Sequence, residues 1–265
     1  NDMTTPDNKN ASFYVELPSR GLIEIEGEER HAFLQRLISN DIDLLKTQPA
    51  IYACLLTPQG KFLHDFFVTE GPDVLLIDCE GHARAQDLYE RLQKYKLRTK
   101  VNISVEPANH VYVCYNAQPD PGYLDPRHED LGWRSYIHHE NAKQGEFSSW
   151  DEKRIALGII DGSRDAVVEK STLDELNIEK FNGVSYTKGC FVGQELTARM
   201  HHRGLGKKHL KVVQGETLPP SHTDLKSEDS KLVGEMRSSS GDKGLALLKD
   251  DFDGEFDEYQ IRILG

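Results

Sequence analysis

Alternation of apolar and polar residues predicts short β-strands in the first half of the chain. Residues 21–27 alternate and end at Gly27, which is typical of a short strand. Runs rich in β-branched and aromatic residues predict further strands at 51–56, 62–69, 74–79, 101–105, 111–115 and 133–138. The turn Pro58-Gln59-Gly60 joins the first two of these runs, so we expect a hairpin over 51–69.

Apolar residues at helical spacing predict three helices, over 28–40, 82–96 and 150–157. Ser148 and Ser149 precede the third helix and can cap its first turn. Between 163 and 187 the chain has little periodicity and many polar groups, so this segment is expected to be a loop. A loop of about 25 residues usually serves a purpose.

The C-terminal part alternates short strands with turns, with strands expected at 210–213, 232–236, 245–248 and 259–263. This pattern is typical of a small β-barrel or sandwich. The acidic run from Asp250 to Glu258 lacks the spacing of a calcium-binding loop and is interpreted as a solvated turn. The predicted fold class is therefore α+β with an all-β end.

Charge and composition narrow the function classes. The 265 residues include 44 acidic and 32 basic side chains, a net charge of −12, which excludes a general nucleic-acid coat. No apolar run approaches the roughly 20 residues of a membrane helix. The first ten residues have neither an apolar signal segment nor an arginine-rich transit pattern. We expect a cytoplasmic protein, or a mature organellar form without its presequence.

The four cysteines do not form a local metal-binding motif. None is arranged as C-x-x-C, which excludes the common zinc and iron–sulfur spacings. Three of them, Cys54, Cys79 and Cys114, lie inside strand-like runs and are expected to be buried thiols. His201 and His202 are adjacent on a predicted helix and point about 100° apart. Solvated histidines are therefore expected there, and no metal site is predicted.

The segment 188–211 is the most unusual part of the sequence, with six basic residues and one acid, Glu195. A helix is plausible from Gln194 to His202, so Cys190 would lie just before a helix N-terminus and near Lys188. Both neighbours favour a reactive thiolate, although an inert buried cysteine in a turn is the alternative. The basic cluster could be a solvated loop, bind a small anion such as the carboxylates of a polyglutamylated cofactor, or contact RNA. A small anion fits best with one compact patch on an acidic protein.

Residues 188–195, KGCFVGQE, followed by Arg199, resemble the K-G-C-[FY]-x-G-Q-E-x-x-x-R signature of the YgfZ family. This is a folate-binding branch related to the glycine-cleavage T-protein, an aminomethyltransferase. The resemblance covers nearly the whole chain, through similar segments at 20–23, 33–35, 39–41, 56–62 and 154–158. The chain most resembles alphaproteobacterial members and the related mitochondrial iron–sulfur assembly factor.

The resemblance implies a T-protein-like multi-domain ring, with a central channel that binds tetrahydrofolate or a one-carbon derivative, and a small C-terminal β-barrel. The implied units are a discontinuous α+β domain of residues 10–50 plus 106–205, an inserted β-β-β-α-β domain of 51–105, and a barrel of 206–265.

The resemblance also implies roles for individual residues. Cys190 and Lys188 are expected to carry the activity. The residues expected to bind folate are Tyr52, Asp65, Gln194, Glu195 and Arg199, with a plain core aromatic as the alternative for Tyr52. Two T-protein carboxylates are missing: only Asp65 remains of the G-G-x-x-D-D pair, and Ala156 replaces the other. Unpaired pterin donors are costly, so the losses argue against aminomethyl transfer in the T-protein manner.

The expected function is a tetrahydrofolate-binding accessory protein that supports assembly or repair of [4Fe–4S] enzymes, including tRNA methylthiolation, through Cys190. Its expected partners are folate and iron–sulfur enzymes or assembly proteins, with an indirect link to tRNA and none to a membrane. One alternative is a folate-dependent one-carbon transferase. Another is a non-enzymatic scaffold for a tRNA-modifying enzyme, which would use the patch of Arg199, Arg203, Lys207 and Lys208. The expected compartment is the bacterial cytoplasm or the mitochondrial matrix.

Overall fold

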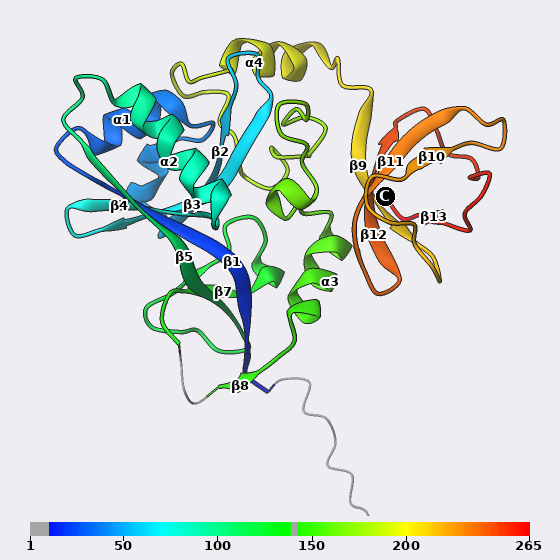
Figure 1. Cartoon of the computed structure of the whole chain (residues 1–265), viewed down its shortest axis with the longest axis horizontal. Coiled ribbons are helices and arrows are strands. Elements are labelled where there is room, and N and C mark those ends of the chain that lie inside the picture. The colour runs from blue at the N-terminus through cyan, green and yellow to red at the C-terminus, as the bar shows by residue number, and fades with distance from the viewer. Residues whose placement is uncertain (1–10, 139–141) are drawn as a thin grey trace, which may run out of the picture.

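The computed structural model describes residues 11–138 and 142–265 of the chain. Residue 10, where the first predicted unit begins, lies outside the described residues. Two sheets organise the molecule: a large one in the body and a smaller one at the C-terminal end (Figure 1). This arrangement confirms the predicted α+β class with an all-β end.

The large sheet has the strand order β2-β3-β4-β1-β5-β7-β6, and all of these neighbours pair antiparallel. Its strands are β1 (Phe13–Glu26), β2 (Ala50–Leu56), β3 (Phe62–Gly71), β4 (Val74–Glu80), β5 (Asn102–Tyr115), β6 (Tyr123–Leu124) and β7 (Trp133–Ser135). A short β8 (Lys143–Gln144) pairs parallel with the start of β1. The predicted hairpin over 51–69 is confirmed by the pairing of β2 with β3.

Strand β1 is twice the length that the alternation predicts, and the two strands predicted at 101–105 and 111–115 form the single strand β5. The register between β1 and β5 shifts at Leu17, Arg20 and Leu22, which marks a β-bulge. Pro18 and Pro107 lie at this irregularity and interrupt the alternation. Because β1 lies between β4 and β5, one sheet crosses the expected boundaries at 50/51 and 105/106. The division into three units stays a prediction.

Four α-helices accompany the sheets in the described residues: α1 (Arg30–Leu37), α2 (Ala83–Lys96), α3 (Phe147–Leu157) and α4 (Gln194–Arg203). The first two bury an apolar stripe against the large sheet, where Phe33 and Leu88 join one core with Ile23 and Val68. The predicted serine cap of α3 is wrong. The helix begins at Phe147 after Glu146, so both serines lie inside its first turn.

The predicted loop at 163–187 is confirmed: its regular structure is limited to the short 3₁₀ turn Gly162–Arg164 (η3) and an isolated β-bridge between Thr172 and Lys61. Its apolar residues are nevertheless buried. Leu173 and Ile178 pack with Tyr52 of β2 on one side and Leu210 of the small sheet on the other. The loop therefore forms the core that joins the two sheets.

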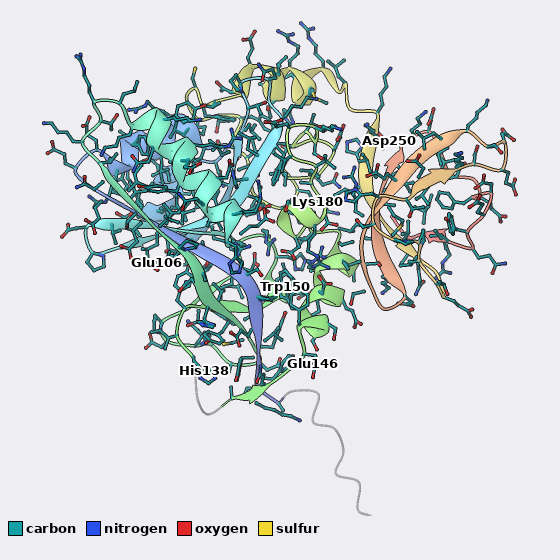
Figure 2. All side chains as sticks on the ribbon, viewed as in Figure 1. Glu106, His138, Glu146, Trp150, Lys180 and Asp250 are labelled. Atoms are coloured by element: carbon teal, nitrogen blue, oxygen red, sulfur yellow. The ribbon has the colours of Figure 1, made fainter. Side chains whose placement is uncertain are left out.

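The small sheet has the order β10-β11-β12-β9-β13, with β9 (Lys208–Gln214), β10 (Asp224–Lys226), β11 (Leu232–Ser240), β12 (Lys243–Lys249) and β13 (Arg262–Ile263). Its own core contains Val213, Leu225, Met236 and Leu248. A chain of polar contacts fastens it to the body: His209 bonds both Asp174 (2.9 Å) and Asp250 (2.8 Å). In Figure 2 Lys180 and Asp250 mark this boundary from its two sides.

Candidate functional site: a cysteine segment and an arginine cavity

Two regions of the molecule contain the residues singled out above. We call residues 188–193, just before α4, the cysteine segment. We call a cavity of about 500 Å³, beside β1, β3, β4 and α3, the arginine cavity. Figure 1 shows α4 at the upper edge of the molecule, while α3 lies near its centre. The predicted site residues are divided between these two places.

Cys190 is the one exposed cysteine of the chain, and the predicted burial of Cys54, Cys79 and Cys114 is confirmed. Burial raises the pKa of the Cys54 thiol well above its ordinary value. A buried, protonated thiol is a poor nucleophile and a poor metal ligand. Any thiol chemistry with another molecule therefore has to use Cys190.

Lys188 does not present its ammonium to the solvent beside the thiol. Its Nζ donates to three backbone carbonyls, those of Gln35 (2.7 Å), Ile38 (2.7 Å) and Asn40 (2.8 Å). Carbonyls at the end of a helix lack intrahelical partners, so a lysine there supplies the missing donors at the end of α1. Burial lowers the pKa of Lys188 to about 8, while Asp41 and Asp43 act in the opposite direction. Lys188 thus fastens the cysteine segment to α1.

The glycines of the motif have different local functions. Gly193 has φ +81° and starts α4, and a Cβ there would lie 2.6 Å from the carbonyl oxygen of Thr57. Glycine is required at such a position, because it tolerates a positive φ and a close backbone approach. Gly189, in contrast, has nothing within 4 Å of where its Cβ would be. The cysteine segment is therefore held in place at its two ends, by Lys188 and Gly193, while the space beside Gly189 and Cys190 is not filled by other residues.

Three of the residues that were expected to bind folate lie on α4 and do not line the arginine cavity. Gln194 and Glu195 begin the helix, and Arg199 makes an ion pair of 3.3 Å with the exposed Glu195. Exposed basic residues and two exposed leucines lie along α4 and the segment that follows it. They are Leu196, Arg199, Arg203, Leu205, Lys207 and Lys208. The predicted basic patch is thus a real surface, immediately after the thiol.

Tyr52 and Asp65 meet on the facing strands β2 and β3. The Tyr52 hydroxyl donates a hydrogen bond of 2.6 Å to Oδ2 of Asp65, and both side chains are buried. Burial and the nearby Glu80 raise the pKa of Asp65 to about 6, against the opposing effects of the Tyr52 bond and Arg20. Asp65 lines the arginine cavity. The pair therefore offers one carboxylate whose charge changes close to neutral pH.

Five arginines line the cavity, and they come from four separate parts of the chain. They are Arg20, Arg84, Arg127, Arg134 and Arg164. Three are paired with other carboxylates: Arg84 with Glu80 (3.2 Å), Arg127 with Asp125 (2.9 Å), and Arg164 with both Asp151 (2.8 Å) and Asp161 (2.9 Å). These pairs hold the guanidinium planes in fixed directions.

Arg20 and Arg134 share a single carboxylate. Asp78 accepts from Nε of Arg20 (2.8 Å) and from Nη2 of Arg134 (2.6 Å), and all three side chains are buried or nearly so. Burial acts to raise the pKa of Asp78, but the two guanidiniums hold it below its ordinary value. Sequence reasoning missed this cluster. The available signal was an aspartate inside the apolar run Val74–Glu80, because a carboxylate in a buried strand needs a cationic partner.

The histidines of α4 do not form a metal centre. His201 stacks on Tyr186 with ring centroids 3.8 Å apart and lies 3.1 Å from a carboxylate oxygen of Glu179. In residues 11–138 and 142–265 no group of three or more His, Cys, Asp or Glu side chains is placed to hold a metal ion. Nor does any helix in these residues have the length and apolar character needed to cross a membrane.

Comparison with known proteins places this geometry in context. Residues 207–253 match the model of a family described as the CAF17 C-terminal β-barrel domain. The chain is 30% identical over 274 residues to the mouse mitochondrial iron–sulfur cluster assembly factor IBA57, covering 88% of this chain and 76% of the relative. The human protein of the same name is 30% identical over 272 residues, with the same coverage.

A solved structure shares the fold. It is the glycine cleavage system aminomethyltransferase T from Bartonella henselae, which matches with a TM-score of 0.74 at 12% identity. The match covers 92% of this chain and 80% of that one. The chain thus has the T-protein-like fold, with a β-barrel unit at its C-terminal end.

Proposed function

Because the chain belongs to the family of the mitochondrial iron–sulfur cluster assembly factor IBA57, we propose that it too assists the assembly or repair of [4Fe–4S] enzymes. The observation that carries the proposal is Cys190, the exposed thiol of a segment that is otherwise held tightly in place. The cluster, or its iron, is cargo in this proposal and not a resident cofactor.

Cys190 has to act together with thiols from elsewhere. Iron–sulfur clusters are commonly held by four cysteine thiolates. The other three cysteines of this chain are buried, and the described residues contain no other group of metal-ligating side chains. We therefore propose that Cys190 supplies one ligand while a partner protein supplies the rest. The open space beside Gly189 gives such a partner room to approach.

The partner docks, in this proposal, on the surface that follows the thiol. Leu196, in the first turn of α4, and Leu205, just after the helix, are exposed apolar residues, and Arg203 and Lys207 add positive charge at the C-terminal end of α4. Such a surface favours an acidic iron–sulfur protein and increases its rate of association. The same patch supports the alternative of a scaffold for a tRNA-modifying enzyme, which would require binding without a role for the thiol.

The test replaces the thiol in cells that lack their own copy of the protein. Cys190→Ser should abolish support of a [4Fe–4S] enzyme such as aconitase, while the circular dichroism spectrum of the purified variant stays that of the wild type. Thr187→Ala, at an exposed position just before the cysteine segment, is the matched control and should retain full support. Full support by Cys190→Ser would overturn the proposal.

The proposal extends to tRNA methylthiolation, because radical enzymes of this kind use [4Fe–4S] clusters. Loss of methylthiolated nucleosides in cells carrying Cys190→Ser, measured by mass spectrometry of digested tRNA, would support this extension. Unchanged levels would restrict the function to other cluster enzymes. The proposed compartment is the mitochondrial matrix for a eukaryotic protein and the cytoplasm for a bacterial one.

We also propose that the arginine cavity binds tetrahydrofolate. The volume of about 500 Å³ is in the range of small-molecule sites. Asp65 fits the pterin ring, because only its Oδ2 has a hydrogen-bond partner among the described residues and Oδ1 remains to accept an N–H. The arginines fit the glutamate carboxylates. Tetrahydrofolate would supply a carrier for a one-carbon unit there. Ala156 lines a different cavity, near the C-terminal sheet, so it adds nothing to this site.

Calorimetric titration of tetrahydrofolate tests the folate proposal. Micromolar binding to the wild type and to Cys190→Ala, weakened in Asp65→Ala, is the expected result. Absence of binding to the wild type would remove folate from the account and leave the function of Cys190 unaffected.

A further inference from the structure

A second cavity, of about 430 Å³, lies between the loop of residues 167–175 and the strands β10, β11 and β12 of the small sheet. We call it the interface cavity, because one wall belongs to the body and the other to the C-terminal sheet. The described residues that line it are all different from those of the arginine cavity and of the cysteine segment. Its volume is within the range of sites for small molecules.

Arg237, on β11, is the buried cation of the interface cavity. Its side chain is 6% exposed, and among the described residues only its Nη1 donates a hydrogen bond, to the carbonyl oxygen of Asp165 (3.2 Å). Nε lies 3.3 Å from Oε1 of Glu235 in an ion pair that lacks hydrogen-bond geometry, so Nε has no acceptor in the described part of the chain. Arg237 therefore keeps N–H groups for a ligand.

A second buried donor, the hydroxyl of Ser171, comes from the loop on the other wall. Its oxygen accepts the N–H of Val167 (2.8 Å), while its own proton has no acceptor among the described residues. Ser171 is buried and lines the cavity, as Arg237 does. Because buried donors are nearly always paired with protein, water or ligand atoms, these two donors indicate that an acceptor occupies the cavity.

The charged groups of the lining favour an anion as this acceptor. The cations are Lys170, Lys208, Arg237 and Lys249, and the carboxylates, one fewer, are Glu175, Asp224 and Glu235. Glu175 pairs with Lys208 (3.9 Å), and Glu235 pairs with both Arg237 and His222. In the described residues Lys170 and Lys249 have no carboxylate at ion-pair distance. Asp224, the unpaired carboxylate of the lining, is exposed on the edge strand β10 and solvated.

We propose that the interface cavity is a binding site for a small oxyanion, which carries a phosphate or carboxylate group. Arg237 and Ser171 donate hydrogen bonds to its oxygens, Glu235 keeps the guanidinium in position, and Lys170 and Lys249 supply positive charge at the rim. Because the donors come from the body and from the small sheet, a bound anion connects the two. The site does not depend on folate binding or on the function of Cys190.

Calorimetric titration of the full chain tests the site, with inorganic phosphate as the phosphate probe and malonate as the carboxylate probe. We expect saturable binding of at least one probe to the wild type. Arg237→Met, which removes the charge and the N–H groups together, should raise the Kd at least about tenfold. Binding of phosphate alone identifies a phosphate ligand, and binding of malonate alone identifies a carboxylate ligand.

Asp224→Asn acts in the opposite direction. Removal of this unpaired carboxylate should lower the Kd by about two- to threefold, because it repels an anion in the same cavity. A variant that only loosened the fold would not bind the probe more tightly. Arg262→Met, at an exposed position on β13 outside the cavity, is the control and should bind the probe as the wild type does.

Arg134→Met shows whether the probe binds in the arginine cavity instead, since Arg134 is also buried with an unpaired Nε. If Arg134→Met loses phosphate and malonate binding while Arg237→Met keeps it, the proposal is wrong. p-Aminobenzoylglutamate, the fragment of folate that carries its carboxylates, should show that reverse pattern if the folate proposal is right. Absence of that pattern bears on folate alone.

Hydrogen exchange gives a second measurement. The bound probe should slow exchange in residues 167–175 and in β11 together, and leave exchange in α2 unchanged. Should Arg237→Met fail to fold, Ser171→Ala and Lys170→Met replace it, and each should raise the Kd about threefold. Absence of saturable binding of both probes to the wild type, or equal binding by the wild type and all of these cavity variants, would overturn the proposal.

Discussion

The arginine cavity and the cysteine segment place reactive groups in opposite settings. In the cavity the buried Arg20 and Arg134 are both bonded to Asp78, so the positions of these three side chains are fixed before any ligand arrives. In the segment Cys190 is exposed, and Lys188 fixes only the backbone beside it. A preorganised cavity suits a small molecule, whereas an exposed thiol on an anchored loop suits a second protein.

The comparison predicts that the cavity contributes to stability and that the thiol does not. The largest effect is expected from Asp78→Asn, which leaves the two buried guanidiniums without a carboxylate. The cost should be about 4 kcal/mol of the free energy of unfolding, measured by urea denaturation. Glu90→Gln, on the exposed side of α2, is the control and should change little. A cost below about 1 kcal/mol for Asp78→Asn would show that the cluster is not a structural unit.

Asp65 should make the cavity sensitive to pH. Burial raises the pKa of Asp65 from its ordinary value of 3.8 to about 6, so the folded protein binds this proton more tightly than the unfolded chain does. The resulting stabilisation is fully present below about pH 4 and is lost as the pH rises through 6; it amounts to about 3 kcal/mol. Asp65→Asn should remove that dependence from the pH profile of unfolding. Identical profiles for the two proteins would contradict the assignment.

The same proton should affect anion binding. Below pH 6 Asp65 is neutral, which removes a negative charge from the wall that faces Arg20 and Glu80. The Kd for p-aminobenzoylglutamate should therefore be about three- to tenfold lower at pH 5 than at pH 8. Asp65→Asn should bind with little pH dependence. Tighter binding at the higher pH would reverse the sign and refute the account of the cavity.

Lys188 connects the two regions, since it belongs to the motif but is buried like a cavity residue. Lys188→Met leaves the carbonyls of Gln35, Ile38 and Asn40 without this donor and should cost about 2 kcal/mol. Hydrogen exchange should rise in 185–193 and stay unchanged in β12. Lys207→Met, at an exposed position, is the control. Unchanged exchange in the segment would show that Lys188 does not anchor it.

The smallest change in stability is expected where the loss of function is greatest. Cys190→Ser should alter the free energy of unfolding by less than about 0.5 kcal/mol, because the side chain is exposed and has no packing to lose. A large destabilisation would mean that the thiol has a structural function and would weaken the inference from its exposure.

Local patterns predicted much of the fold. The hairpin of β2 and β3, the helices α1 and α2 and the four C-terminal strands β9, β11, β12 and β13 follow from the spacing of apolar residues. The prediction failed where the pattern is interrupted without ending the strand. Pro18 and Pro107 fall at a bulge, where the alternation breaks while the two strands remain paired on both sides. The cap of α3 failed because a serine in the first turn cannot be distinguished from one before it.

The two candidate regions differ in how far a sequence can predict them. The cysteine segment is contiguous, so its unusual composition is visible along the chain. The arginine cavity is assembled from residues between Arg20 and Arg164, and only the pairing of strands brings Asp78 between Arg20 and Arg134. The carbonyl partners of Lys188 are likewise some 150 positions away in sequence. Such contacts depend on the tertiary fold and leave no local signal.

The central claim, that Cys190 ligates iron–sulfur cargo together with external thiols, is tested most directly by anaerobic reconstitution. The protein is mixed with ferrous iron, sulfide and glutathione, which supplies the missing thiols, and is then separated by gel filtration. The wild type should elute with the visible absorption of sulfur-ligated iron, and Cys190→Ser should elute without it. Equal absorption in both proteins, or none in the wild type, would contradict the claim.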